Sequence, residues 1–171
     1  MAAAGTDAPA PSALLIRPVR RGDLDAVIAL DASVTGLEKR RYWSSVYRRY
    51  GTGQTRDAGQ QFLVAVAQGR VLGFVIGEVR DWEFGSPPCG WVFAIDVDPQ
   101  ARLAGVGTRL LQAISDGFRR AGVRKLRTML ARDNTLILSF FRSQGLMAGP
   151  LISLEADLDP EPAARPAGAP A

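Results

Sequence analysis

The chain has 171 residues, of which 47% are hydrophobic, and this is enough for one domain with a single packed core. It contains no histidine and one cysteine, so the sequence excludes catalytic pairs of serine or cysteine with histidine, metal sites built on those residues and an internal disulfide; we expect no metal. The formal net charge of +4 is spread along the chain without a dense basic run, so we expect no nucleic-acid partner.

The ends of the chain differ in composition from the middle. Residues 1–12 and 159–171 are rich in alanine, proline and glycine, and we predict that they are disordered tails. The N-terminus lacks the features of a signal or transit peptide, and no apolar run approaches the roughly 18 residues that cross a bilayer. We therefore predict a cytoplasmic protein without a membrane partner, and a single domain over residues 13–158.

The first half of the chain predicts one strand, two helices and a pair of antiparallel strands. A short strand is expected at 14–18, a helix from about Asp23, which is available as its cap, and a second helix at about 38–50. Two apolar runs at 61–67 and 71–79 are separated by a glycine turn, so they predict a hairpin.

The second half alternates between strands and helices. In order, we expect a loop at 82–90, a buried strand at 91–97, a helix at about 106–121, a strand at 125–131, a helix at 135–144 and a last strand within 149–158. This order of elements is typical of a three-layer α/β or α+β domain, with a mixed sheet and helices on both faces.

Two glycines, Gly105 and Gly107, stand between the strand at 91–97 and the helix after it. A P-loop needs a lysine directly after Gly107, and a dinucleotide fingerprint needs glycine or alanine where Leu110 stands, so both are excluded. The pattern Arg/Gln-x-x-Gly-x-Gly/Ala fits, beginning at Arg102. Backbone N–H groups at a helix N-terminus attract anions and glycine allows close approach, so we predict a phosphate-binding loop; an ordinary helix start is the alternative.

The same six residues resemble the pyrophosphate loop of the GNAT superfamily, the acyl-CoA-dependent N-acyltransferases. Val97-Asp98-Pro99 is similar to the V-x-P end of that family's fourth strand, and Asn134 to Leu146 is similar to its second motif, N-x-x-A-x-x-F-Y-x-x-x-G-F. Ile16-Arg17-Pro18 and Gly22-Asp23-Leu24 are similar to its first strand and helix start. The resemblance covers residues 14–158 and implies a mixed, mostly antiparallel sheet.

The resemblance also implies acetyl-CoA as co-substrate, bound between the fourth and fifth strands. Backbone groups near Ile95 would pair with pantetheine, the amides that begin at about Leu103 would bind the pyrophosphate, and Asn134 would bond the cofactor arm or cap a helix. The cofactor-binding candidates are Ile95, Val97, Arg102, Leu103, Ala104, Gly105, Val106, Gly107, Thr108, Asn134 and Phe141.

The implied reaction is direct attack of a primary amine on the thioester in a ternary complex. An alkyl ammonium must first lose a proton, and Asp96 and Glu78 are the candidate bases, with Asp81 and Glu83 as alternatives. The backbone N–H of Val97 would stabilise the oxyanion. Simple alternation turns Asp96 toward solvent if its neighbours face the core, whereas a bulge in the strand would change the face that it occupies.

One position departs from the family pattern. Phe141 stands where many relatives carry a tyrosine that protonates the departing thiolate. A thiol has a pKa of about 8.5, so a thiolate is a fair leaving group, and Ser139, Ser143 or water can replace the tyrosine. This departure favours an alternative function, a non-catalytic acyl-CoA-binding sensor or interaction module.

The resemblance places the acceptor site between the first two helices and the loop at 82–90. Those segments carry Tyr42, Trp43, Tyr47, Trp82, Phe84 and Trp91, which would stack on a cation or pack in the core. Asp81 and Glu83 would suit an amine, so we predict a small-molecule or peptide amine as acceptor. The strand expected at 151–158 offers an edge for a homodimer.

Overall fold

The computed structural model describes residues 14–52 and 59–158, and the tails predicted at 1–12 and 159–171 lie outside the described residues. The chain divides into two compact units, one that ends at Asp133 and one that begins at Asn134. None of the described helices is long and apolar enough to span a membrane.

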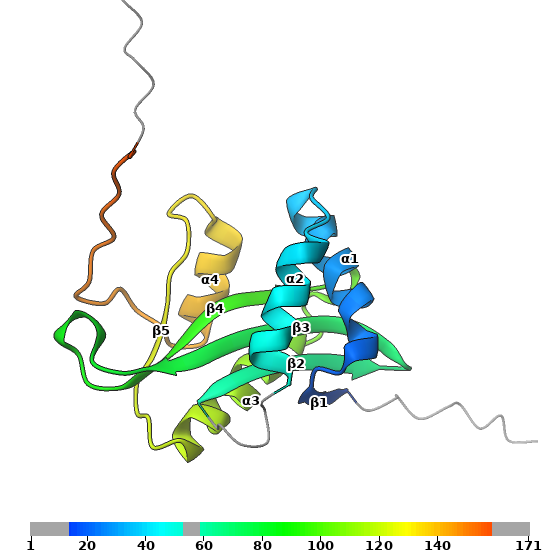
Figure 1. Ribbon diagram of the computed structural model, residues 1–171, viewed down its shortest axis with the longest axis horizontal. Coiled ribbons are helices and arrows are strands. Elements are labelled where there is room, and N and C mark those ends of the chain that lie inside the picture. The colour runs from blue at the N-terminus through cyan, green and yellow to red at the C-terminus, as the bar shows by residue number, and fades with distance from the viewer. Residues whose placement is uncertain (1–13, 53–58, 159–171) are drawn as a thin grey trace, which may run out of the picture. The chain divides into compact units, whose positions relative to one another are not determined.

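The first unit is built on a five-stranded sheet in the order β1-β2-β3-β4-β5 (Figure 1). The strands are β1 (Leu15–Pro18), β2 (Gln60–Ala67), β3 (Arg70–Arg80), β4 (Cys89–Val97) and β5 (Leu126–Thr128). The first four strands pair antiparallel with their neighbours, and β5 pairs parallel with β4. The predicted mixed, mostly antiparallel sheet is therefore confirmed.

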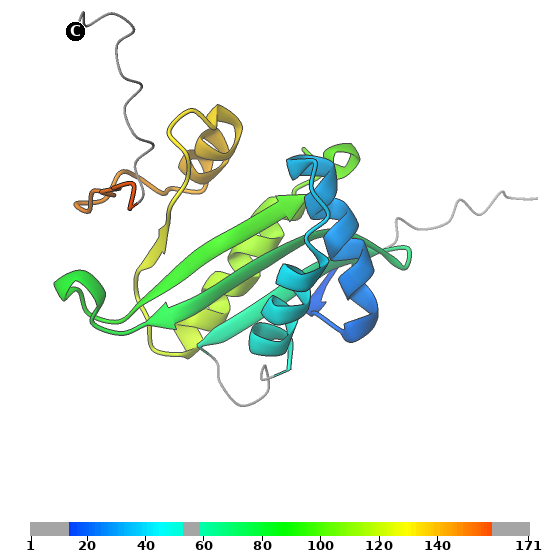
Figure 2. The ribbon, with the colours of Figure 1, turned by 45° about the horizontal axis from the view of Figure 1, so that its top comes forward.

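Helices cover both faces of this sheet (Figures 1 and 2). Helices α1 (Leu24–Thr35) and α2 (Arg40–Val46) lie on one face, and α3 (Val106–Arg120) lies on the other. Apolar residues at helical spacing on α1 and α2 meet alternate residues of β2 and β3 and exclude water between the layers. Residues of this core that are at most 2% exposed are Val27, Ile28, Trp43, Phe62, Val64, Phe74 and Ile76.

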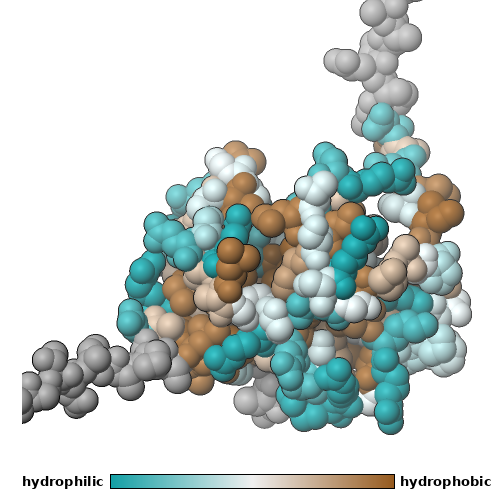
Figure 3. Space-filling view, turned by 180° about the vertical axis from the view of Figure 1, so that it is seen from behind, coloured by the Kyte–Doolittle hydropathy of each residue, from teal (hydrophilic) through white to brown (hydrophobic). Residues whose placement is uncertain are grey.

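The second core lies between the sheet and α3. The buried stripe of α3 recurs every three or four residues and consists of Val106, Leu110, Leu111, Ile114 and Phe118. Strand β3 approaches closely at Gly77, where a Cβ would collide with the backbone oxygen of Trp91 and with Phe118. Seen from behind, the lower edge of the molecule carries mainly hydrophilic side chains, as expected for the solvent-facing side of an amphipathic helix (Figure 3).

Two local features differ from the predicted ones. The helix expected at 38–50 is divided into α2 and a π-helical turn at Tyr47–Gly51. The side chain of Asp23 does not cap α1, because it accepts hydrogen bonds from the backbone N–H of Arg20 at 2.7 Å and from the guanidinium of Arg17 at 2.6 and 2.9 Å. The bond from Arg17 lowers the pKa of Asp23 below its ordinary value and ties β1 to the start of α1.

The second unit contains α4 (Thr135–Ser143) and an extended C-terminal segment. Asn134 is the N-cap of α4, and its side-chain oxygen accepts a hydrogen bond from the backbone N–H of Ile137 at 3.2 Å. The strand predicted within 149–158 is wrong, because the described residues 144–158 form no strand. A strand needs a neighbour for its N–H and C=O groups, and no described strand pairs with this segment.

Candidate functional site

Strands β4 and β5 separate soon after they meet. They pair only as Gly90 with Leu126, Trp91 with Arg127 and Val92 with Thr128. Strand β5 then ends, whereas β4 continues to Val97. In the first unit, no described strand covers this side of β4 beyond Val92, so the backbone of its second half borders a gap.

A β-bulge in β4 lies at the point where the two strands separate. In the pairing with β3, Ile76 is opposite Ala94 and Gly77 is opposite Val92, so Phe93 is the extra residue. Phe93 contacts the ring of Tyr50 at 5.2 Å between centroids, and Ala94 packs against the core under α1 and α2. Two consecutive residues therefore face the α1 and α2 side, and the alternation is shifted for the rest of the strand.

The bulge places Asp96 on the α1 and α2 face. Asp96 is opposite Phe74, which packs against Trp43 of α2, and directly opposite residues share a face. Val97 is opposite Gly73 and lies near Leu110 of α3 on the other face. The solvent-facing alternative for Asp96 therefore does not describe this strand.

The backbone of β4 presents two amides to the gap left by β5. The N–H of Asp98 donates to the carbonyl oxygen of Leu72 on β3 at 2.9 Å. Backbone groups alternate in direction along a strand, so the N–H groups of Ile95 and Val97 point away from β3. Both residues are predicted to bind the cofactor, and their amides face the side of β4 that β5 leaves unpaired after Val92.

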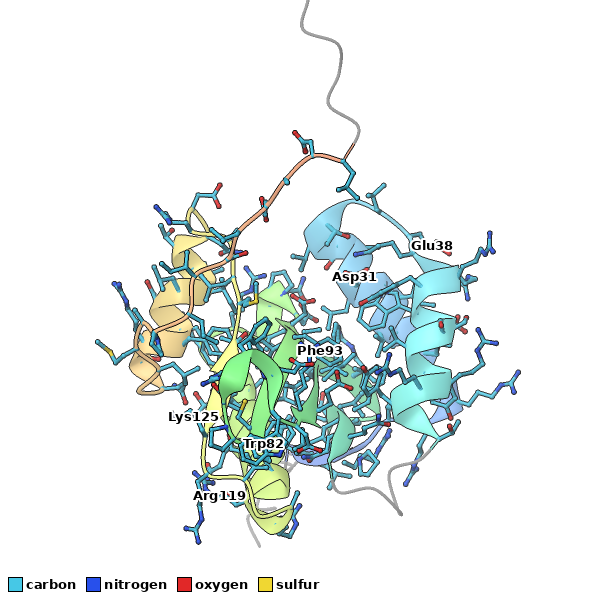
Figure 4. All side chains as sticks on the ribbon, turned by 60° about the vertical axis from the view of Figure 1, so that its left-hand side comes forward. Asp31, Glu38, Trp82, Phe93, Arg119 and Lys125 are labelled. Carbon is cyan, nitrogen blue, oxygen red and sulfur yellow. The ribbon has the colours of Figure 1, made fainter. Side chains whose placement is uncertain are left out.

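Burial and a second carboxylate control the charge of Asp96. Its pKa is raised to about 6, first by burial and then by the negative charge of Asp31, while Lys39 and Arg102 act in the opposite direction. Asp31 lies on α1 and is 4% exposed. It accepts hydrogen bonds from Lys39 Nζ at 2.9 Å and from the indole N–H of Trp43 at 2.8 Å. Figure 4 shows Asp31 on α1 beside α2, with Phe93 on the neighbouring strand.

Glu78 is buried on the same face of the sheet but has a different environment. Its carboxylate accepts hydrogen bonds from the hydroxyl of Tyr50 at 3.0 Å, from Arg80 Nε at 3.1 Å and from Arg49 at 3.5 Å. Burial and the bond to Glu78 raise the pKa of Tyr50 to about 12. Glu78 thus holds the π-helical turn against β3, and its oxygens are already occupied by donors.

The glycine loop leaves backbone amides exposed before α3. The side chain of Asp98 accepts from the N–H of Gln100 at 2.9 Å and starts a short turn. Leu103 and Gly105 then have positive φ angles of 69° and 75°. The N–H of Arg109 donates to the carbonyl of Gly105, so the amides that precede Arg109 in the first turn have no acceptor within the helix.

This loop holds an unusual residue in a strained conformation. A leucine with positive φ costs roughly 1–2 kcal/mol, and the side chain of Leu103 gains no packing because it is fully exposed. Arg102, Ala104, Gly105 and Thr108 are also exposed, whereas Val106 is buried and anchors the loop to the core. Gly107 follows Val106 in the first turn of α3. A loop with free amides, positive φ angles and a buried anchor is suited to bind an anion with its backbone.

Two candidate cofactor residues belong to the second unit. Asn134 is exposed and caps α4, which confirms one of the two roles considered for it. Phe141 is 3% exposed, and its ring lies 5.2 Å from that of Phe140.

Two features of the α1 and α2 face were not predicted from the sequence, the role of Asp31 and the partner of Glu78. Asp31 gave one signal, since it continues the apolar stripe of Val27 and Ile28 at helical spacing, and a carboxylate there needs a partner. The pairing of Glu78 with Tyr50 gave none, because those residues are far apart in the sequence. Of the predicted aromatic set, Trp43 and Trp91 are buried, and Tyr42, Trp82 and Phe84 are exposed.

A parallel strand that leaves its neighbour, a bulge where they part and a glycine loop before the next helix define a GNAT-type fold. The chain belongs to the acetyltransferase (GNAT) family, whose model matches residues 28–146.

Named relatives agree with this assignment. The chain is 36% identical over 86 residues to the L-2,4-diaminobutyric acid acetyltransferase of Nocardia farcinica. The matched segment covers 50% of this chain and 43% of that protein. It is 30% identical over 128 residues to the mycothiol acetyltransferase of Saccharomonospora viridis. That match covers 72% of this chain and 42% of the relative. The chain thus spans less than half the length of these two relatives.

A solved structure with a similar fold is the aminoglycoside N-acetyltransferase AAC(6')-Iy in complex with CoA. The TM-score is 0.75 at 19% sequence identity, and the match covers 89% of this chain and 99% of that chain. At this identity the similarity establishes the fold.

Proposed function

We propose that the chain is an N-acetyltransferase that transfers an acetyl group from acetyl-CoA to a primary amine of a small molecule or peptide. The observation that carries this proposal is the gap between β4 and β5, into which the amides of Ile95 and Val97 point. A cofactor with amide groups in an extended arm can pair with such an edge as an added strand would.

In this proposal the loop before α3 binds the pyrophosphate. The amides of Leu103, Ala104, Gly105, Val106, Gly107 and Thr108 supply donors, and the guanidinium of Arg102 adds positive charge. Asn134 and Phe141 complete the proposed set of cofactor-binding residues.

The proposed chemistry needs one base and one oxyanion donor. Asp96 accepts a proton from the ammonium, the neutral amine nitrogen attacks the thioester carbon, and the N–H of Val97 donates to the oxyanion. The attack leaves a positive charge on the nitrogen, which loses its second proton to water. The C–S bond breaks and its electron pair leaves with sulfur, and the departing thiolate takes a proton from water. Phe141 cannot donate that proton. Because a thiol has a pKa of about 8.5, the thiolate can leave near neutral pH without a protein group that protonates it.

Asp96 suits the role of base better than Glu78. A pKa of about 6 leaves Asp96 ionised at neutral pH and still basic enough to accept a proton. Glu78 is engaged by Tyr50 and two arginines, so its proposed role is weaker than that of Asp96.

The names of the relatives support a small-molecule acceptor, since they name diaminobutyric acid and mycothiol acetyltransferases. A cytoplasmic location also belongs to the proposal. A homodimer is proposed on the exposed apolar side chains of the C-terminal segment, Leu151, Ile152, Leu154 and Leu158. Light scattering of wild type and of a variant with Ile152→Ser and Leu154→Ser tests it: equal masses at the monomer value contradict it.

Thermal unfolding with acetyl-CoA tests the cofactor site. Gly105→Asp places a carboxylate in the proposed pyrophosphate loop, and Gly122→Asp is the matched control, because both glycines have positive φ and open space at the Cβ position. Both variants should lose some stability, but only Gly105→Asp should lose the increase in Tm that acetyl-CoA gives to wild type. Equal cofactor stabilisation of all three proteins would show that the loop does not bind the phosphates.

A non-catalytic acyl-CoA-binding sensor or interaction module is the second candidate, and Phe141 is the residue that favours it. Release of free CoA thiol in the presence of an amine separates the two candidates. Binding of acetyl-CoA without thiol release across amino acids, polyamines, aminoglycosides and peptides would support the sensor.

A further inference from the structure

The extra residue of the β4 bulge contacts an aromatic ring from a distant segment of the chain. Phe93 is 38% exposed, and its ring lies 5.2 Å from that of Tyr50 at an angle of 55°. Tyr50 is 6% exposed and belongs to the π-helical turn that follows α2. Aromatic rings at this separation attract one another, so the turn holds the side chain that the bulge adds to the strand.

Tyr50 is itself held in place by two neighbours. Its hydroxyl donates to Glu78 at 3.0 Å, and the guanidinium carbon of Arg49 lies 5.2 Å from the centre of its ring. Glu78 also accepts a hydrogen bond from Arg80 Nε at 3.1 Å, so the carboxylate that receives the hydroxyl is fixed on β3. The pKa of Tyr50 is raised to about 12, first by burial, so the hydroxyl stays protonated and donates at neutral pH.

The hydrogen bond from Tyr50 reaches β3 directly beside the bulge. Gly77, which precedes Glu78, is opposite Val92, and the register between the two strands moves by one residue after this pair. Tyr50 therefore contacts β3 at Glu78 and β4 at Phe93, next to the point where the bulge begins. A side chain that bridges both strands at this point opposes a shift of one strand along the other.

The positions of the proposed catalytic groups depend on this register. Asp96 is opposite Phe74, and Val97 is opposite Gly73. A shift of one residue that removed the bulge would place Ile95 opposite Phe74 and Asp96 opposite Gly73. Asp96 would then leave the α1 and α2 face, and the amides of Ile95 and Val97 would turn toward β3.

We propose that Tyr50 is a positioning residue for acetyl transfer, which holds Phe93 in the bulge and thereby keeps Asp96 on the α1 and α2 face. The same contact keeps the amides of Ile95 and Val97 directed at the gap beside β4. Tyr50 acts through Phe93 and takes no part in proton transfer. This inference rests on the proposed function for its kinetic consequence, whereas the register of β4 is a property of the chain itself.

Replacement of the Tyr50 ring tests the kinetic consequence. Tyr50→Leu should lower kcat by at least about tenfold and change KM for acetyl-CoA by less than about threefold, because the glycine loop assigned to the phosphates is not altered. Tyr50→Phe keeps a ring against Phe93 and should retain kcat within about threefold of wild type. Val27→Ala, which removes fully buried side-chain atoms on α1, is the control and should lower Tm while kcat stays nearly unchanged. A kcat of Tyr50→Leu no lower than that of Val27→Ala would overturn the proposal.

A second variant removes the same contact from the side of the bulge. Phe93→Ala should reproduce the loss in kcat, and it should cost less stability than Tyr50→Leu because Phe93 is partly exposed. Adding Tyr50→Leu to Phe93→Ala should lower kcat little further, since the two residues act through one contact. Losses that multiply in the double variant would contradict a role of Tyr50 that acts through Phe93.

The register of β4 can be measured without any reaction. Nuclear Overhauser contacts between the backbone protons of Phe74 and Asp96 report it in the full chain without acetyl-CoA. These contacts should persist in wild type, Tyr50→Phe and Val27→Ala, whereas in Tyr50→Leu they should weaken and contacts between Phe74 and Ile95 should appear. Unchanged contacts in Tyr50→Leu would overturn the proposal, whatever the rates. Contacts that change only in Tyr50→Leu support it even if wild type releases no thiol with any amine, a result that would reject the proposed function alone.

Discussion

At Asp96, burial and the charge of Asp31 act against the charges of Lys39 and Arg102, and burial prevails. Asp31 itself is fixed by Lys39 and by the indole of Trp43, so the charge that acts on Asp96 has a defined position. In the proposed mechanism Asp31 therefore has a positioning and electrostatic role, and Asp96 accepts the proton.

Asp96→Asn should separate activity from stability. The pKa of Asp96 is raised from 3.8 to about 6, so its contribution to stability is complete below pH 3.8 and is lost as the pH rises through 6. At pH 8 the charged, partly buried carboxylate lowers the stability of the folded state. Replacing it with asparagine should therefore raise the free energy of unfolding by about 1 kcal/mol, a value reduced for partial exposure. Urea unfolding at pH 4 and pH 8 checks this, and Asp116→Asn on the exposed side of α3 is the control.

The same residue predicts the pH profile of the reaction. If Asp96 is the base, kcat/KM should fall as the pH drops below about 6, and Asp96→Asn should lower kcat by roughly 100-fold or more. If Asp96→Asn has the same pH profile of kcat/KM as wild type, Asp96 is not the base, and Glu78 or water accepts the proton.

At the level of elements, the junction of β1 and α1 depends on the ion pair of Arg17 with Asp23. Both side chains are largely buried, so removing Arg17 leaves a carboxylate with one backbone donor. Arg17→Met should lower the free energy of unfolding at pH 7 by about 1–3 kcal/mol. The pKa of Asp23 is lowered, so this loss should shrink as the pH falls below its ordinary value of 3.8.

The exposed pair of Arg40 and Asp25 is the control for that prediction. Both side chains are mostly in water, and Asp25→Asn should change stability by less than about 0.5 kcal/mol. Chemical unfolding at pH 7 and pH 3 compares the two pairs, and equal effects at both pH values would contradict the ion-pair account.

The close contact between β3 and β4 gives another element-level prediction. Gly77→Ala should destabilise the first unit by about 1–3 kcal/mol, because the new Cβ meets a backbone oxygen of Trp91, which cannot move aside freely. Gly22→Ala, where nothing lies near the added carbon, is the matched control and should change stability little. Thermal unfolding of the two variants checks the difference.

Most elements could be predicted because their apolar periods are clear, as in α3 and in the hairpin of β2 and β3. The position of Asp96 could not, since one extra residue at Phe93 changes the face of every residue after it. The stacking of Arg127 on Trp91 also gave no signal, because these residues meet only through the parallel pairing of β4 with β5. The strand expected at 149–158 had a suitable pattern but no described neighbour.

At the scale of the whole molecule, the proposed function assigns different roles to an edge and a face of the sheet in the first unit. The edge of β4 that β5 leaves open carries the proposed cofactor contacts of Ile95 and Val97. The face under α1 and α2 carries Asp96 and Glu78. Cofactor and acceptor would therefore approach β4 from different directions and meet near the bulge.

The central claim is that this chain joins an acetyl group to an amine. A single-turnover experiment with purified chain, acetyl-CoA and L-2,4-diaminobutyrate measures CoA thiol and acetylated amine together by mass spectrometry. We predict that both form in equal amounts, and that Asp96→Asn slows their formation by roughly 100-fold. Acetyl-CoA that binds and raises Tm, but yields neither product with this acceptor or with a panel of other amines, would contradict the account.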